Sequence, residues 1–374
     1  MIYLDHNATT PIDSRVLEAM LPYLATFYGN PSSLYRAGRV VRSAVETARE
    51  QVAALVSVQS AQVIFTSGGT EANNLAIKGV TASLSAASLA VSAIEHPSIL
   101  DTAKSLLARD CKVDEIAVDE QGLISPDCLS EVTKKRLDFA SMMLVNNETG
   151  VIQPIADLAE RLKQKAIVIH SDAVQAAGKI AVNFASLNID LMTLSSHKIY
   201  GPKGAGALIV DKAIALEPLL SGGGQEAGYR AGTENVAAII GFGKAAEFAL
   251  AELDARSEHL TCLQKQLQVG LKEINGLTIF SEQVERLPNT IQFGIPETDG
   301  EMLQMQLDKK GFAVSSGSAC ASGGGEPSHV LLAMGVDRQL AKSAIRVSLG
   351  QDNTPADVDQ FLVLLKSLLI ASDE

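Results

Sequence analysis

Two ionisable side chains follow apolar runs in the middle of the chain. Asp172 comes after the run 167–169, and Lys198 comes after the run 191–194 with His197 beside it. A buried carboxylate is unfavourable unless it meets a cation or hydrogen-bond donors. A partly desolvated lysine is an amine of the type that forms Schiff bases. Together they resemble a pyridoxal site, where a carboxylate keeps the ring nitrogen protonated and a lysine holds the aldehyde.

A turn of small residues offers a place for a phosphate. Gly68, Gly69 and Thr70 lie between the apolar run 63–65 and the helical stretch 71–76. Backbone N–H groups and a hydroxyl at a helix N-terminus suit a phosphate, although small-residue turns also occur without a ligand. The sequence has neither a Walker A motif nor a properly placed G-x-G-x-x-G. A small phosphorylated cofactor is therefore favoured over a nucleotide.

Polar clusters follow five predicted strands, which must bring these residues together. The strands and the clusters after them are 63–65 with 66–71, 89–94 with 95–96, 142–145 with 146–148, 167–169 with 170–172, and 191–194 with 195–198. Short β-branched runs alternate with helical stretches, which predicts an α/β sheet. Ligands bind beyond the carboxyl ends of parallel strands, so the five clusters could converge on one crevice.

Each residue also has an ordinary structural interpretation. Asp172 alone could cap a helix, and Lys198 alone could be a solvated loop residue. His96 alone is more often a packing histidine. The joint occurrence of these residues after successive strands favours the functional interpretation.

Two helices can be placed by pattern. Apolar residues recur at spacings of three and four over the range 34–56, at Val41, Val45, Ala48, Val52 and Leu55. The last helix is predicted to begin with Thr354 as N-cap and Pro355 in the first turn. Both are expected to pack against the body of the protein.

Length and composition exclude several classes of function. The chain has 374 residues, 47% of them hydrophobic and 20% charged, so a large domain with a smaller companion is expected. A net charge of -12 opposes direct nucleic-acid binding. Neither a signal peptide nor a long apolar run is visible, which predicts a cytoplasmic protein without a membrane role.

The cysteines show no shared pattern. They are widely spaced and form no C-x-x-C pair, so neither a disulfide framework nor a metal site is expected. Cys111, Cys128 and Cys262 are interpreted as small apolar residues. Cys320 differs, because it lies among serine, glycine and alanine before the run Gly323 to Gly325, a composition that permits backbone movement.

Several long motifs carry a family resemblance. They are Tyr3 to Pro11, Gly29 to Ser33, Thr66 to Glu71, Asn146 to Glu148, Asp172 to Gln175, Ser195 to Gly204 and Ser315 to Cys320. In these motifs the chain resembles the NifS/IscS-like cysteine desulfurases of the class V aminotransferase superfamily, and Ser315 to Cys320 resembles their first subgroup. The resemblance implies an α/β protein of the pyridoxal-phosphate transferase fold type I. A large domain at 13–255 would hold a mixed, mainly parallel sheet, and a smaller α+β domain would comprise 1–12 and 256–374.

The resemblance also implies roles around pyridoxal 5'-phosphate. Lys198 would form the Schiff base, Asp172 would pair with the ring nitrogen, Gln175 would bond the ring hydroxyl and His96 would stack on the ring. Thr70, Ser195 and His197 would hold the phosphate, with Thr233 of a second subunit, and Gly69 and Asn147 complete the cofactor-binding set. A homodimer is therefore expected.

The implied reaction removes sulfur from L-cysteine. Asn147 and Arg346 would bind the substrate carboxylate, and Lys198 or His96 would move protons. Cys320 as thiolate would attack the substrate sulfur, which leaves alanine and an enzyme persulfide. The sulfur would pass to an acceptor protein, either an iron-sulfur scaffold or a tRNA-thiolation enzyme.

Other functions stay open on the same scaffold. One alternative is an aminotransferase or a selenocysteine lyase, and Cys320 argues against the aminotransferase because transamination needs no mobile thiol. The second alternative is a weakly active binding platform that relays sulfur through protein contacts.

Overall fold

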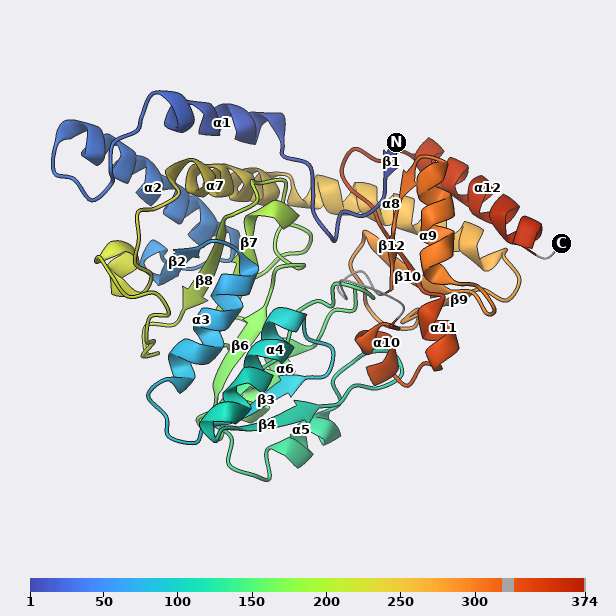
Figure 1. The fold of residues 1–374 in the computed structure, drawn as a ribbon, viewed down its shortest axis with the longest axis horizontal. Coiled ribbons are helices and arrows are strands. Elements are labelled where there is room, and N and C mark those ends of the chain that lie inside the picture. Colours follow the sequence, from blue (N-terminus) through green and yellow to red (C-terminus); the bar gives the residue numbers. More distant parts are fainter. Residues whose placement is uncertain (318–325, 373–374) are drawn as a thin grey trace.

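A seven-stranded sheet forms the centre of the larger part of the molecule (Figure 1). The computed structural model describes residues 1–317 and 326–372. The strand order is β2-β8-β7-β6-β5-β3-β4. The strands are β2 (Val63–Thr66), β3 (Ser88–Ser92), β4 (Lys112–Ile116), β5 (Phe139–Ser141), β6 (Val168–Asp172), β7 (Leu191–Ser195) and β8 (Gly206–Val210). The α/β class with a mixed, mostly parallel sheet is confirmed.

The directions of the strands agree with the prediction from the polar clusters. β8 is antiparallel to both of its neighbours, β7 and β2, so β2 runs in the same direction as β7. β7, β6, β5 and β3 pair in parallel. The five strands followed by polar clusters therefore present their carboxyl ends at the same edge of the sheet, as predicted.

Several strand boundaries differ from the prediction, and two of the differences concern the polar clusters directly. The strand expected at 142–145 lies earlier, at 139–141, because pairing with β3 stops at Ser141. Beyond that point the backbone N–H groups of Met142 and Leu144 still bond to β6. Asp172 was expected to follow its strand but is the last residue of β6, since it pairs with Thr193 of β7.

Helices cover both faces of this sheet because its apolar side chains alternate. In β8, Ala207 and Ile209 enter one core, and Leu208 and Val210 enter the other. The first face is covered by α1 (Ser14–Ala25), α2 (Arg36–Leu55), α5 (Pro126–Val132), α6 (Ile155–Lys163) and α7 (Val236–Ala251). The opposite face is covered by α3 (Gly69–Thr81) and α4 (Pro97–Leu106).

The amphipathic helix predicted from periodicity is confirmed as α2. All of its predicted core residues are buried, namely Val41, Val45, Ala48, Val52 and Leu55. The last helix, α12 (Pro355–Ser372), also begins as predicted. The N–H of Asp357 donates to Thr354 Oγ1 over 3.3 Å, and the N–H of Thr354 donates to Asp357 Oδ2 over 2.8 Å.

A smaller part of the molecule holds a second core. Its antiparallel sheet has the order β12 (Ser315–Ser316), β13 (Ile345–Ser348), β10 (Thr290–Gly294) and β9 (Thr278–Ile279), and β1 (Ile2–Tyr3) pairs in parallel with β11 (Phe312–Ala313). Its helices are α8 (Leu253–Lys272), α9 (Gly300–Lys309), α10 (His329–Ala333), α11 (Arg338–Lys342) and α12. The predicted division at residues 255 and 256 falls inside α8, and it stays a prediction.

Four short 3-10 turns complete the described elements. They are η1 (Ser60–Gln62), η2 (Leu107–Arg109), η3 (Ser196–Lys198) and η4 (Gln225–Gly228). Lys198 is therefore the last residue of η3, which directly follows β7.

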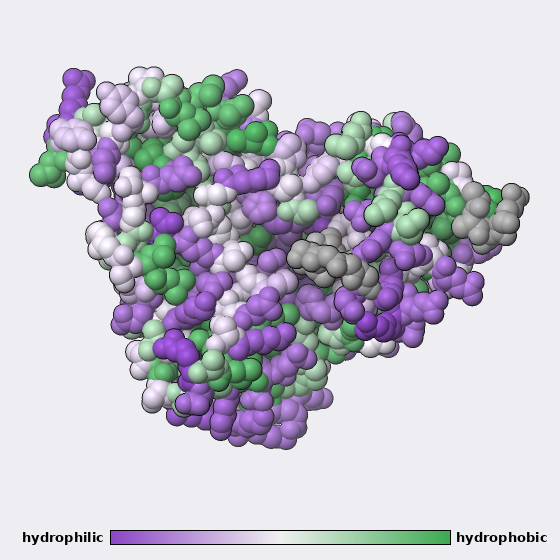
Figure 2. Space-filling view, in the orientation of Figure 1, coloured by the Kyte–Doolittle hydropathy of each residue, from purple (hydrophilic) through white to green (hydrophobic). Residues whose placement is uncertain are grey.

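Polar and apolar residues are mixed over the visible surface, and hydrophobic residues, drawn in green, gather over α1 (Figure 2). Leu17, Leu21 and Leu24 of that helix are 41%, 51% and 64% exposed. Across residues 1–317 and 326–372, no helix has the length and hydrophobicity that a membrane span requires.

Candidate active site

A cavity of about 340 Å³ lies at the carboxyl edge of the large sheet. Ten residues predicted from the sequence line it, namely Gly69, Thr70, His96, Asn147, Asp172, Gln175, Ser195, His197, Lys198 and Arg346. They come from strand ends of the large sheet, from the starts of α3 and α4 and from β13 of the small sheet. The predicted convergence of the polar clusters is therefore confirmed.

One end of the cavity is formed by the start of α3. Gly68 is the N-cap and Gly69 the first helical residue, so backbone N–H groups of the first turn are directed toward this end. A Cβ on Gly69 would lie 3.1 Å from Cγ2 of Val174, a tight contact that would require the valine side chain to shift. Ser195 Oγ is buried and has no hydrogen-bond partner among the described residues. This end could hold an anion.

Asp172 is buried at the end of β6 and is held by neutral donors. Its Oδ1 accepts from the N–H of Val174 over 2.9 Å, and its Oδ2 accepts from Asn73 Nδ2 over 2.8 Å. Asn73 also donates to Ser98 Oγ over 2.8 Å. In the described chain the Asp172 carboxylate forms no ion pair. Its negative charge is therefore available to pair with a cationic group of a ligand.

Lys198 lines the cavity and meets the N-terminal segment. Its Nζ donates to the backbone carbonyl oxygens of Asn7 and, over 2.7 Å, of Ala8. The carbonyl of Asn7 also accepts from Gln175 Nε2 over 2.9 Å. The motif Tyr3 to Pro11 is visible in the sequence, but no role was predicted for Asn7 or Ala8. The contacts use backbone oxygens, which leave no signal in a residue pattern.

Two histidines of the site are held in the neutral form. Burial, and then the positive charges of Lys198, Lys203 and Lys179, lower the pKa of His197 to about 4. Burial also lowers the pKa of His96, with a smaller opposing effect from Asp172. His96 is the N-cap of α4, where its Nδ1 accepts from the N–H of Ser98 over 3.1 Å. The proton of neutral His96 is thereby assigned to Nε2.

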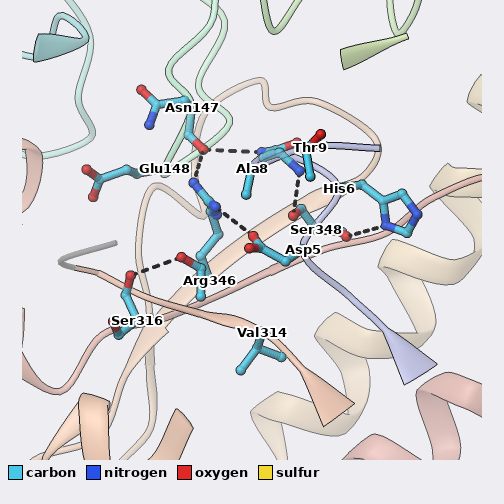
Figure 3. A network of polar contacts seen from close by, with 12 residues as sticks. Asp5, His6, Ala8, Thr9, Asn147, Glu148, Val314, Ser316, Arg346 and Ser348 are labelled. Atoms are coloured by element: carbon cyan, nitrogen blue, oxygen red, sulfur yellow. Dashed lines mark hydrogen bonds and ion pairs between the residues drawn. The ribbon is translucent and has the colours of Figure 1, made fainter. Parts of the chain in front are cut away.

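Arg346 also lines the cavity, and Figure 3 shows the polar contacts around its side chain. Its Nη1 donates to the backbone carbonyl of Asn147 over 2.9 Å, and its Nη2 forms an ion pair with Asp5 Oδ1 over 2.7 Å. The Nε atom is buried without a partner among the described residues. Figure 3 shows the Asn147 side-chain amide pointing away from Arg346. Asp5 was not predicted, although it lies in the N-terminal motif.

Of the predicted residues that the structure describes, one is not brought into the cavity. Thr233 is exposed and is not among the residues that line it, so its role in a second subunit stays a prediction. Its segment is anchored nearby by Glu226, which accepts from Arg49 over 2.6 Å and from the N–H of Phe65 over 2.8 Å. Cys320 lies outside the described residues. No group of three or more residues able to hold a metal was found in the described ranges.

Known proteins resemble this chain over nearly its whole length. The sequence profile of the aminotransferase class-V family matches residues 2–361. A protein named cysteine desulfurase IscS from Dictyoglomus turgidum is 43% identical over 371 residues, which covers 98% of this chain and 94% of the relative. A protein of the same name from Methanosarcina thermophila is 40% identical over 370 residues, with 98% and 92% covered.

Solved structures agree with the sequence relatives. A structure described as a NifS-like protein superimposes with a TM-score of 0.93 at 37% identity and covers 98% of this chain and 99% of its own. A structure described as SspA in complex with cysteine has a TM-score of 0.83 at 31% identity, with 95% and 100% covered. Because the profile and these relatives span almost the full chain, the protein belongs to the aminotransferase class-V family.

Proposed function

We propose that this chain is a pyridoxal-phosphate-dependent cysteine desulfurase. The observation that carries the proposal is the shared cavity in which Asp172, Lys198 and Arg346 meet from separate elements. The names of the relatives, and the similar structure of SspA in complex with cysteine, support the same substrate.

The residues of the cavity fit the cofactor at three points. The first turn of α3, with Thr70 and the partnerless hydroxyl of Ser195, suits a phosphate. Asp172, which has only neutral donors, suits a protonated ring nitrogen. Lys198 lies in the same cavity with its amine directed at backbone carbonyl oxygens. Phosphate, ring and aldehyde therefore each have a matching group.

When bound, pyridoxal phosphate supplies a ring that accepts electron density from the α-carbon of an amino acid, which makes loss of the α-proton easier. The protein would supply position and proton transfer. Arg346 would bind the substrate carboxylate through its N–H groups, and Asp5 would keep the guanidinium oriented. The amine of Lys198 would hold the cofactor and move the α-proton, with Nε2–H of His96 as the second proton donor on the cavity wall.

Sulfur transfer would use Cys320. Its thiolate would attack the substrate sulfur, so that one S–S bond forms as the C–S bond of cysteine breaks. The products are alanine and a persulfide on Cys320, and neither an oxidant nor a reductant is consumed. The persulfide sulfur would then move to an acceptor protein, either an iron-sulfur scaffold or a tRNA-thiolation enzyme.

The proposal includes a homodimer. The exposed leucines of α1 support an apolar contact between protomers, and the exposed position of Thr233 is compatible with its reaching a neighbouring site. The division into a large domain and a small domain, and the cytoplasmic location, belong to the same proposal.

The test is the stoichiometry of the products. The protein, reconstituted with pyridoxal phosphate, is incubated with L-cysteine and a thiol reductant, and alanine, sulfide, mercaptopyruvate and pyruvate are measured together. A desulfurase gives equal amounts of alanine and sulfide. Mercaptopyruvate, which keeps the sulfur atom of cysteine, would indicate an aminotransferase, and pyruvate with sulfide would indicate β-elimination. Cofactor binding without any product would indicate a binding platform. A competition between cysteine and selenocysteine measures the preference between the two substrates.

A further inference from the structure

Lys179 is a buried lysine behind the cavity, and the proposed function leaves it without a role. It is 8% exposed, and its Nζ donates to Asn7 Oδ1 over 2.8 Å and to Gln175 Oε1 over 2.7 Å. Within residues 1–317 and 326–372, no carboxylate forms an ion pair with it. Lysine is almost never fully buried without a paired charge, so its position requires an explanation beyond packing.

The backbone before Lys179 explains how the side chain reaches this place. Gly178 has a φ of 75°, and a Cβ at that position would lie 2.7 Å from Cγ2 of Ile199. Only glycine satisfies both the left-handed conformation and this close approach. The turn therefore packs directly against the segment that carries Lys198.

Positive groups surround the amine of Lys179. Burial, and then the charges of Lys198 and Arg346, lower the pKa of Lys179 well below its usual value. His6 and His197 are the other titratable groups influenced by it. The two hydrogen bonds that the amine donates go to the side-chain amide oxygens of Asn7 and Gln175, which are neutral groups. Lys179 therefore serves here as a hydrogen-bond donor to two amides and not as a partner in an ion pair.

We propose that Lys179 is a positioning residue that fixes the side-chain amide of Gln175 with its nitrogen toward the cofactor. The inference rests on the proposed function. With Oε1 of Gln175 bound to Lys179, Nε2 donates to the carbonyl of Asn7 and has a second N–H. The reversed amide would set Oε1 against the Asn7 carbonyl and Nε2 against the donors of Lys179. Both contacts are unfavourable, so the amide is held as a donor on the cavity wall.

The effect of removing Lys179 should be confined to Gln175. Oδ1 of Asn7 also accepts from Asn289 Nδ2 over 3.1 Å, so it keeps a donor without the lysine. Among the described residues, Oε1 of Gln175 accepts from Lys179 alone. An apolar residue at position 179 would therefore leave the Gln175 amide without its donor, whereas the Asn7 amide would keep its hydrogen bond from Asn289.

A double-mutant cycle tests this coupling through cofactor binding. Apo forms of wild type, Lys179→Met, Gln175→Met and the double variant are titrated with pyridoxal phosphate, and the absorbance maximum of the bound cofactor is recorded without substrate. Lys179→Met is expected to raise the Kd about tenfold and to reproduce the spectral shift of Gln175→Met. When Gln175→Met is already present, adding Lys179→Met should change neither the Kd nor the absorbance maximum. Lys244→Met, the same substitution on the surface of α7, is the matched control and should behave as wild type.

Other outcomes separate the possible failures. Independent effects, with the double variant showing the product of both Kd changes, would overturn the inference, as would a wild-type Kd and spectrum in Lys179→Met. Circular dichroism of the apo forms checks folding, and Lys179→Leu carries the same cycle if Lys179→Met does not fold. If wild type itself binds no pyridoxal phosphate, the proposed function fails; if wild type binds it and the variants are unchanged, only the role of Lys179 fails.

Discussion

The amine of Lys198 donates a hydrogen bond to the backbone carbonyl of Asn7, a residue 191 positions earlier in the chain. Asn7 is almost completely buried, and its side chain connects both parts of the molecule. Nδ2 donates to Thr290 Oγ1 over 2.8 Å, and Oδ1 accepts from Lys179. The N-terminal segment is therefore a wall of the candidate site.

Asn7→Ala should weaken both the fold and the site. The substitution leaves Lys179 and Thr290 each without one buried hydrogen-bond partner, so the free energy of unfolding is expected to fall by about 1–3 kcal/mol. The Kd for pyridoxal phosphate should rise as the segment loosens. Denaturant titration and cofactor titration measure the two effects. Asn183→Ala, at an exposed asparagine, is the control, and an equal loss in both variants would contradict the role of Asn7.

Lys198→Ala should abolish turnover while the fold is retained. The amine that holds the cofactor and moves the α-proton is removed, so alanine formation should fall about 10³-fold or more. Borohydride reduction followed by peptide mapping should attach the cofactor to Lys198 in wild type. Lys203→Ala, an exposed lysine five residues later, should keep wild-type activity and attachment. Attachment to another lysine in wild type would refute the assignment.

Arg346→Lys should impair substrate binding more than chemistry. A lysine keeps the positive charge but cannot serve Asp5, the carbonyl of Asn147 and a substrate carboxylate in one planar arrangement. The KM for cysteine is expected to rise about tenfold or more, with a smaller change in kcat. Arg338→Lys, at an exposed ion pair with Glu326, is the control. An unchanged KM in Arg346→Lys would show that the carboxylate binds elsewhere.

His170 should make stability depend on pH. It is fully buried between Ser141 and Thr193, and burial lowers its pKa to about 3, below its usual 6.5. Between these values the unfolded state binds more protons, so stability is lost as the pH falls, by about 1.4 kcal/mol per pH unit from this group. Denaturant titrations between pH 7 and pH 4 should show a shallower decline for His170→Gln than for wild type. Parallel curves would contradict the prediction.

The sequence predicted best what depends on side-chain patterns. The periodic apolar residues of α2 form a buried face, so the first and last residues of this helix were predicted closely. Residues placed after successive apolar runs, such as Asp172 and Lys198, converge because parallel strands end at one edge. The strand at 139–141 was misplaced because Met142 and Leu144 are buried and apolar although pairing with β3 has ended.

The contacts that were missed depend on backbone atoms and on residues far apart in the chain. The carbonyl oxygens of Asn7 and Ala8 carry no residue-type signal. The ion pair of Asp5 with Arg346 joins positions 341 residues apart, and a single sequence cannot indicate it. Lys179 resembles any surface lysine until its burial is known.

A single turnover with equimolar L-cysteine and no reductant tests the central claim most directly. The account predicts one alanine per cysteine consumed and one added sulfur atom on the peptide that contains Cys320. Cys320→Ala should still bind cofactor and cysteine but form no alanine. Pyruvate in place of alanine, sulfur on another cysteine such as Cys262, or undiminished alanine formation by Cys320→Ala would contradict the account.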